Sequence, residues 1–156
     1  MPNFPPIAEL LPHDDEMVLL SEVIEYTVKV TVCRTVIRAD GLFANADGST
    51  GSWLGLELMA QCVAAHSGLA RRSEGQPPRI GFLLSSRRLH FASNRYHAGQ
   101  RLRIRSEHVW GKSTGMVSLS CSIHDEKSDT LLAEATLNFF LPKDKAELEA
   151  TLAASA

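Results

Sequence analysis

The chain has 156 residues, of which 44% are hydrophobic and 22% are charged, and its formal net charge is -2. This length fits one domain, over residues 1–156, that can bury a full core without disulfide bonds. The near-neutral charge gives no reason to expect binding to nucleic acid or to a membrane. No apolar run approaches the ~20 residues that a membrane span needs.

The cysteines and the N-terminus both predict a cytoplasmic protein. Cys33, Cys62 and Cys121 are widely spaced, odd in number and outside any CxxC or CxH pattern. We therefore expect reduced, buried thiols and no metal site. Residues 1–16 lack a basic stretch followed by an apolar run, so they do not have the pattern of a signal peptide.

The first half of the chain is expected to hold strands and then one helix. The N-terminal segment, residues 1–16, includes a short helical turn at "IAELLPH". Residues 17–38 are rich in alternating β-branched side chains, which predicts two strands or one long bent strand. Residues 39–52 are rich in Gly, Asp and Asn and are expected to form a loop. A strongly apolar helix follows over residues 52–71, with Ser52 as its N-cap.

Four strand-like runs follow the helix. They are "RIGFLLSSRRLHFAS", "QRLRIRSEHVW", "GMVSLSCSIHDE" and "TLLAEATLNFFLP", separated by turn residues at 94–99, 111–115 and 125–129. Residues 143–156 form a weakly amphipathic tail, helical or frayed. A single helix that is apolar on most sides must be covered by a sheet. The order therefore predicts an α+β hotdog fold, a curved antiparallel sheet wrapped around one long central helix.

Two polar residues interrupt the most apolar turn of the expected helix. Glu57 and Gln61 are spaced i,i+4 and so share one helix face. A buried carboxylate is costly unless it is paired, protonated or used in chemistry. Glu57 is therefore either a structural residue that binds backbone groups or an arginine, or part of an active site.

Several segments resemble the β-hydroxyacyl-acyl carrier protein dehydratases of fatty-acid synthesis. "LLPHDDEMVLLSEVIE" is similar to their LPHR-x-P-hydrophobic-D-R-V opening, and "LELMAQCVAAHSG" to their E-A-M-A-Q-A helix. "GFLLSSRRLHFAS…HAGQRLRIR" is similar to their G-F-L…V-R-F…P-G-D-x-L stretch. The W-x-G-x-E-x-MAQ pattern of the helix resembles in particular a divergent branch found in aryl-polyene pigment clusters. The resemblance runs from Leu11 to Pro142.

The resemblance implies that a 3-hydroxyacyl thioester carried on acyl carrier protein is dehydrated to the enoyl thioester. In the family, a His in a G-H-F-P loop removes the α-proton and a Glu on the central helix of the neighbouring subunit assists hydroxyl loss. A backbone N–H near the helix start polarises the thioester carbonyl. The family also implies a homodimer or higher homo-oligomer. It implies no cofactor beyond the phosphopantetheine that the substrate carries.

In this chain, the helix supplies part of the family's site. Glu57 matches the acid and Gln61 matches the MAQ glutamine, which we expect to contact substrate. Trp53, one turn before Glu57, is expected to wall the site. Ser52 lies at about the position of the family's carbonyl-binding glycine, at the positive end of the helix.

The loop histidine of the family is missing. Leu42 stands in its place in "GLFAN", and His66 falls nearly opposite Glu57 on a helical wheel. His13 of "LPH" is therefore the candidate base, with a backbone-bonded histidine near the N-terminus as the alternative. The remaining histidines, His90, His97, His108 and His124, are expected at the surface.

An acidic carrier protein would need a basic rim around the site. Arg71, Arg72, Arg87 and Arg88 are candidates for this rim. The alternative for each is a solvated position at the end of a helix or strand.

Two other functions stay open. A hotdog thioesterase would use a helix carboxylate to activate water against the same thioester, and the fold hosts both activities. A non-catalytic subunit would bind acyl carrier protein or form a heterodimer with an active hotdog dehydratase, as the missing loop histidine suggests.

Overall fold

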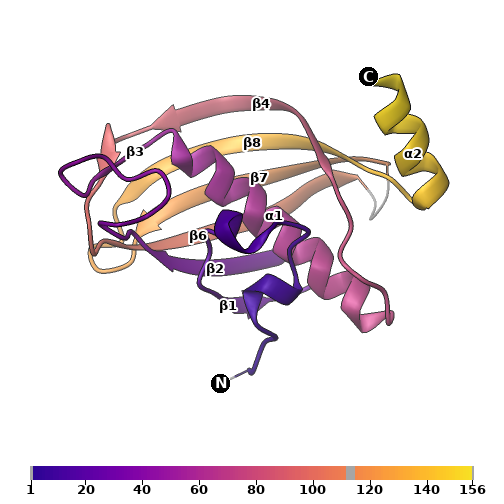
Figure 1. Ribbon diagram of the computed structural model, residues 1–156, viewed down its shortest axis with the longest axis horizontal. Helices are drawn as coiled ribbons and strands as arrows, with labels where there is room; N and C mark the ends of the chain where they lie inside the picture. The colour runs from indigo at the N-terminus through magenta and orange to yellow at the C-terminus, as the bar shows by residue number, and fades with distance from the viewer. Residues whose placement is uncertain (1, 112–114, 156) are drawn as a thin grey trace.

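The computed structural model describes residues 2–111 and 115–155 and confirms the predicted α+β architecture. A six-stranded antiparallel sheet curves around one long helix, α1 (Figure 1). Its strand order is β1-β2-β6-β7-β8-β4, and β3 and β5 form a separate pair. The strands are β1 (Glu22–Tyr26), β2 (Val30–Val36), β3 (Thr50–Gly51), β4 (Phe82–Phe91), β5 (Arg95–Tyr96), β6 (Arg101–Gly111), β7 (Gly115–Asp125) and β8 (Leu131–Leu141). The helices are the 3-10 turns η1 (Ile7–Glu9) and η2 (Asp15–Met17), α1 (Leu54–Ser73) and α2 (Lys145–Ala154).

The alternating strands lie where the sequence predicts them. The run over residues 17–38 forms two strands, β1 and β2, and the four later runs form β4, β6, β7 and β8. The alternating apolar side chains of β6, β7 and β8 face the core, as Ile104, Ile123 and Leu137 illustrate with no exposed surface. Part of the turn predicted at residues 111–115, namely 112–114, lies outside the described residues, as do residues 1 and 156.

Helix α1 begins and ends two residues later than the sequence predicts. Trp53, and not Ser52, is the N-cap, and it makes no side-chain cap hydrogen bond. Ser52 belongs to a tighter turn before the helix, in which the Gly55 N–H donates to the Ser52 carbonyl. At the other end Gly75 has a positive φ of 71°, and the N–H groups of Gly75 and Gln76 donate to carbonyls of the last helical turn. This Schellman arrangement favours glycine and stops the helix after Ser73.

Helix α1 is covered on two sides. It packs against β2, β6 and β7 on one side, and the N-terminal segment crosses its other side (Figure 1). Leu10 and Leu11 of that segment are buried, and the Leu10 carbonyl lies directly over Gly68. None of the helices in residues 2–111 and 115–155 is long and apolar enough to cross a membrane.

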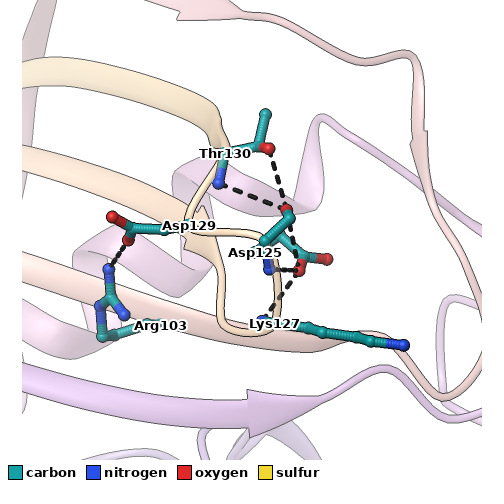
Figure 2. A network of polar contacts seen from close by, with 6 residues as sticks. Arg103, Asp125, Lys127, Asp129 and Thr130 are labelled. Atoms are coloured by element: carbon teal, nitrogen blue, oxygen red, sulfur yellow. Dashed lines mark hydrogen bonds and ion pairs between the residues drawn. The ribbon is translucent and has the colours of Figure 1, made fainter.

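The turn between β7 and β8 is held by local polar contacts (Figure 2). The Asp125 carboxylate accepts the N–H groups of Lys127 and Ser128, each at 2.9 Å. Asp129 has a positive φ of 59° and forms an ion pair with Arg103 of β6. These contacts hold the turn that joins β7 to β8, and β8 supplies Phe139 and Leu141 to the cavity wall described below.

Strand β4 is an edge strand whose side chains are largely exposed on both faces. Only Phe82 and Phe91, at its two ends, are half-buried. Because α1 packs over β2, β6 and β7, this side of the sheet is left partly uncovered. The exposed apolar side chains include Ile80, Leu83, Leu84 and Leu89.

Substitution of Gly68 tests the packing of the N-terminal segment on α1. A Cβ at this position would lie 2.2 Å from the Leu10 carbonyl oxygen, so the backbone must move. We expect Gly68→Ala to lower the free energy of unfolding by about 1–3 kcal/mol, the usual cost of overpacking. Urea denaturation measures the change. Ser73→Ala, at the exposed end of the same helix, is the control and should stay within about 0.5 kcal/mol of the wild type; equal stability of all three proteins would contradict the packing.

Candidate active site

Glu57 and His13 line one cavity beside α1, which we call the Glu57 cavity. Its volume is about 330 Å³. Apart from these two residues its wall is mainly apolar, with Val63, Leu83 and Phe139 from α1, β4 and β8. A pair of titratable side chains in an apolar wall is typical of a small-molecule site.

The two side chains lie close together although they are far apart in the sequence. His13 Nε2 is 3.5 Å from Glu57 Oε1, and the side chains are 27% and 37% exposed, respectively. Glu57 is thus not buried as expected but half-buried and turned to the cavity. The other ring nitrogen of His13, Nδ1, is buried and has no hydrogen-bond partner among the described residues. The imidazole is therefore oriented by packing, with Nε2 directed at the carboxylate.

Gln61 holds Glu57 from behind. Its Nε2 donates to Glu57 Oε1 at 3.0 Å and to the Met17 carbonyl at 2.6 Å, and its Oε1 accepts from the Leu19 N–H at 3.0 Å. The side chain has no exposed surface and does not line the Glu57 cavity. Gln61 therefore lies behind Glu57 and outside the cavity wall, and its contact with a substrate stays a prediction. Glu57 Oε2 makes no hydrogen bond with a described residue and is left to face a ligand.

The structure does not bring Ser52 and Trp53 to this cavity. The Ser52 N–H already donates to the Asn94 carbonyl at 3.0 Å, because β3 pairs with β5 just before the helix. Trp53 is 57% exposed and packs edge-on against Phe43, with ring centroids 5.5 Å apart. Both residues lie near the helix start. Neither lines the Glu57 cavity.

The family's loop position is also remote from this cavity. Leu42, which stands where the loop histidine is expected, is exposed and does not line the Glu57 cavity. His66, predicted to lie opposite Glu57, is buried on the sheet side of α1. A hydrogen bond of 2.6 Å joins its Nδ1 to the hydroxyl oxygen of Thr31. Of the described histidines, only His13 lines the Glu57 cavity.

A second, larger cavity adjoins the first, and we call it the distal cavity. Its volume is about 550 Å³, and it shares Val63, Ser67, Arg79 and Leu141 with the Glu57 cavity. These shared wall residues show that the two cavities lie next to each other along α1.

The distal cavity contains a histidine that the sequence places at the surface. His108 is half-buried, and its ring centroid lies 4.8 Å from that of His66. Burial lowers the pKa of His108. His108 is thus not at the surface as expected but in β6, where its ring packs against that of His66 on α1.

The four predicted rim arginines are separated in space. Arg71 lines the distal cavity, whereas Arg72 is exposed and forms an ion pair with Glu9 at 3.0 Å. Arg87 and Arg88 lie on β4, exposed, and line neither cavity. The structure thus brings one of these arginines, Arg71, to the cavities.

Sequence reasoning missed three further cations of the distal cavity. Lys29, Arg79 and Lys143 come from the β1–β2 turn, the segment before β4 and the segment after β8. No motif marks them, because only the tertiary structure brings these three segments to the same end of α1.

The three cysteines are buried and free, as predicted. A hydrogen bond to Cys62 and burial raise the pKa of Cys33, and burial raises the pKa of Cys121. These two thiols are therefore poor nucleophiles and pack as small apolar side chains.

Comparison with known proteins identifies the family. The family model of the ApeP-like dehydratases, described as ApeP dehydratase, matches residues 5–151. The chain belongs to the ApeP-like dehydratase family. The predicted relation to a divergent branch of hotdog dehydratases is therefore confirmed. No curated protein sequence matches the chain.

Solved structures support the same fold. A chain of the dehydratase heterocomplex ApeI:P from Xenorhabdus doucetiae is 27% identical, with a TM-score of 0.86 over 96% of this chain and 99% of that chain. Thioesterase superfamily member 2 of zebrafish is 13% identical, with a TM-score of 0.62 over 85% and 88%. The TT0310 protein of Thermus thermophilus is 20% identical, with a TM-score of 0.56 over 77% and 90%. The last two likenesses concern the hotdog fold alone.

The buried His66 predicts a stability that falls on acidification. Burial, and then the charge of His108, lowers the pKa of His66 from 6.5 to about 4. Between these values the unfolded chain binds a proton that the folded protein does not, so the free energy of unfolding falls as the pH drops. The expected loss from this residue is about 2 kcal/mol between pH 7 and pH 5.

Urea denaturation at pH 7 and pH 5 measures this effect. His66→Gln keeps a hydrogen-bonding group near Thr31 but removes the titration, so its loss between the two pH values should be smaller than that of the wild type. His97→Gln, at an exposed histidine, is the control and should behave as the wild type. An unchanged loss in His66→Gln would disprove the assignment.

Proposed function

We propose that this protein dehydrates a 3-hydroxyacyl thioester, carried on acyl carrier protein, to the enoyl thioester. The observation that supports the proposal most directly is the His13–Glu57 pair, 3.5 Å apart in the wall of an apolar cavity. Membership of a dehydratase family points to the same reaction.

The spacing of the pair suits an elimination across two neighbouring carbons. His13 is proposed to remove the α-proton through Nε2, while Glu57 donates a proton from Oε2 to the β-hydroxyl, which leaves as water. One proton is taken up and one is delivered, so the reaction needs no other reagent. A proton shift from His13 to Glu57 across their short separation then restores the starting state.

A second hotdog subunit is proposed to cover β4. One edge of β4 does not pair with another strand of the sheet, and β4 carries the exposed side chains of Leu83, Leu84 and Leu89. An uncovered apolar edge strand is a ready surface for strand pairing. Leu83 also lines the Glu57 cavity, so a subunit on this edge would close the cavity from outside. The partner is a second copy of this chain or, as the relative in a dehydratase heterocomplex suggests, a different hotdog subunit.

Substitution of the pair tests the proposed reaction. The purified protein is given a 3-hydroxyacyl thioester on acyl carrier protein, alone and mixed with a second hotdog dehydratase subunit, and the products are separated by mass. We expect enoyl thioester, with a rate lowered about 10²- to 10⁴-fold in Glu57→Gln and in His13→Asn because each removes a proton-transfer group. The double variant should be no slower than the slower single variant, since the two residues act as a unit.

Each other product would point to another function. Free acid and thiol would indicate a thioesterase, and product only in the mixture would indicate a non-catalytic partner subunit. Full activity of Glu57→Gln would refute the assignment of Glu57 as the acid.

Gln61 is proposed as a positioning residue. In Gln61→Leu the carboxylate of Glu57 loses its support, so we expect kcat to fall about 10²-fold with little change in KM, as misplacement of a catalytic group does. Thr35→Val is the matched control, because the Thr35 hydroxyl donates to the Leu19 carbonyl at 2.6 Å and ties down the same segment without touching Glu57. Steady-state kinetics of folded protein, verified by circular dichroism, measures both. An equal fall in kcat in the two variants would mean that Gln61 acts only through the segment.

A further inference from the structure

The lining of the distal cavity changes from polar to apolar across the sheet. Tyr26 of β1 and His108 of β6 line one side, together with Lys29 of the β1–β2 turn. The other side has a buried apolar floor, formed by Val117 and Leu119 of β7 and Leu141 of β8. Because the strand order is β1-β2-β6-β7-β8, these two halves follow one another across the sheet. One half offers hydrogen bonds and the other offers mainly apolar contact.

The two histidines of the polar half differ in their hydrogen bonds. The ring centroids of His66 and His108 are 4.8 Å apart. His66 Nδ1 lies 2.6 Å from the Thr31 hydroxyl, and the backbone of Val28 accepts a further hydrogen bond from the His66 ring. The His108 ring, in contrast, makes no hydrogen bond with any residue of the described ranges. His108 therefore keeps its ring nitrogens for a ligand, whereas those of His66 are already used.

The phenol group of Tyr26 is a second unused donor. The ring is half-buried and packs on the His66 ring, with centroids 5.3 Å apart. Its hydroxyl has no hydrogen-bond partner in residues 2–111 and 115–155. Burial raises the pKa of Tyr26, so the phenol keeps its proton and can donate it to an acceptor. Since half-buried polar groups are normally hydrogen-bonded, Tyr26 and His108 together indicate a ligand with an acceptor group at this end.

Charge selects an anion as this ligand. Lys29 lies beside the two donors and forms no ion pair with a carboxylate of the described residues. Arg71, Arg79 and Lys143 add positive charge elsewhere in the cavity wall, against one acidic residue of the described lining, Glu74. A cavity with an excess of positive charge attracts anions. One ammonium group and two neutral donors at the polar half match the single charge and the two oxygens of a carboxylate.

The dimensions of the cavity require an elongated ligand. Its volume is about 550 Å³, within the range of about 300–1,000 Å³ that is usual for small-molecule sites. Four strand spacings separate β1 from β8 in the sheet, which corresponds to about 19 Å. An anion that fills this space must carry an apolar chain long enough to reach the floor formed by β7 and β8.

We propose that the distal cavity binds a carboxylate that carries an apolar chain, with the carboxylate at Tyr26, Lys29 and His108. The chain lies on the apolar floor of the same cavity. Two sources share this chemistry: a free carboxylic acid, and an acyl chain whose far end is a carboxylate. The inference goes beyond the proposed function, since neither Glu57 nor His13 lines the distal cavity.

Calorimetry tests the carboxylate site without any turnover. Octanoate and octanamide, which has the same chain but no charge, are titrated into wild type, Tyr26→Phe and Tyr96→Phe. We expect octanoate to bind the wild type about tenfold or more tightly than octanamide, and Tyr26→Phe to weaken octanoate about tenfold, the usual effect of losing a hydrogen bond to a charged group. Tyr96→Phe is the matched control. It removes the other tyrosine hydroxyl of the chain, which donates to the Ser52 carbonyl outside this cavity, and should bind octanoate as the wild type does.

A second variant tests the charge. Lys29→Gln should weaken octanoate about tenfold and leave octanamide unchanged, because only octanoate is attracted by the ammonium group. Lys127→Gln, in the turn between β7 and β8, is the control and should bind both ligands as the wild type does. Lys29 is exposed in a turn and Tyr26→Phe removes a single oxygen, so both variants are expected to fold, which circular dichroism verifies.

Three results would overturn the proposal. They are no binding of octanoate, equal affinity of the wild type for octanoate and octanamide, and wild-type affinity for octanoate in both Tyr26→Phe and Lys29→Gln.

Kinetics distinguishes the two sources of the carboxylate. Two 3-hydroxyacyl thioesters of equal chain length are compared, one ending in a methyl group and one in a carboxylate. A KM about tenfold lower for the carboxylate chain in the wild type, but not in Tyr26→Phe, would assign the site to the end of the substrate. Equal KM values together with tight octanoate binding would assign it to a free acid. Octanoate binding as expected in a protein without dehydratase activity would refute the proposed reaction but not this site.

Discussion

The buried amide of Gln61 is the contact on which the rest of the site depends. With one side chain it ties α1 to the carbonyl of Met17 and the N–H of Leu19, and it supports the carboxylate of Glu57. The segment that it fixes to the helix also carries His13. The two groups of the proposed acid–base pair are therefore placed by one hydrogen-bonded residue that does not itself face the cavity. Because a buried amide that loses its partners is costly, this arrangement is strongly specified.

The covering of α1 on two sides explains where a substrate has room. The sheet packs on one side through β2, β6 and β7, and the N-terminal segment packs on another, close enough that only glycine fits at position 68. The Glu57 cavity lies toward β8 and β4, and the distal cavity lies toward the far end of the helix, where β6, β7 and the β1–β2 turn meet it. A partner subunit on β4 would close this open side, which connects the exposed apolar edge of the sheet with the proposed chemistry.

The helix also separates the two kinds of chemistry along its length. Glu57 lies in the first turn beside a cavity whose wall is mainly apolar, and Arg71 lies in the last turn beside the distal cavity. The family relation and the His13–Glu57 pair are independent observations, and both support the proposed dehydration.

Local patterns in the sequence determined the strands, the single apolar helix, the hotdog fold and the choice of Glu57 as a residue that needs an explanation. When one face of a strand or most of a helix is buried, its apolar residues recur at a regular spacing in the sequence. This spacing can be recognised without knowing the fold. Only the tertiary structure decided that His13 meets Glu57, that Gln61 supports the carboxylate, that the Ser52 N–H is used by Asn94, and that Arg79 joins Arg71. These contacts join segments that are distant in the chain, and their partners depend on how the loops and the N-terminal segment pack over α1. No local periodicity records that packing, so the sequence could offer Glu57 and His13 as candidates and only the fold decided that the two meet.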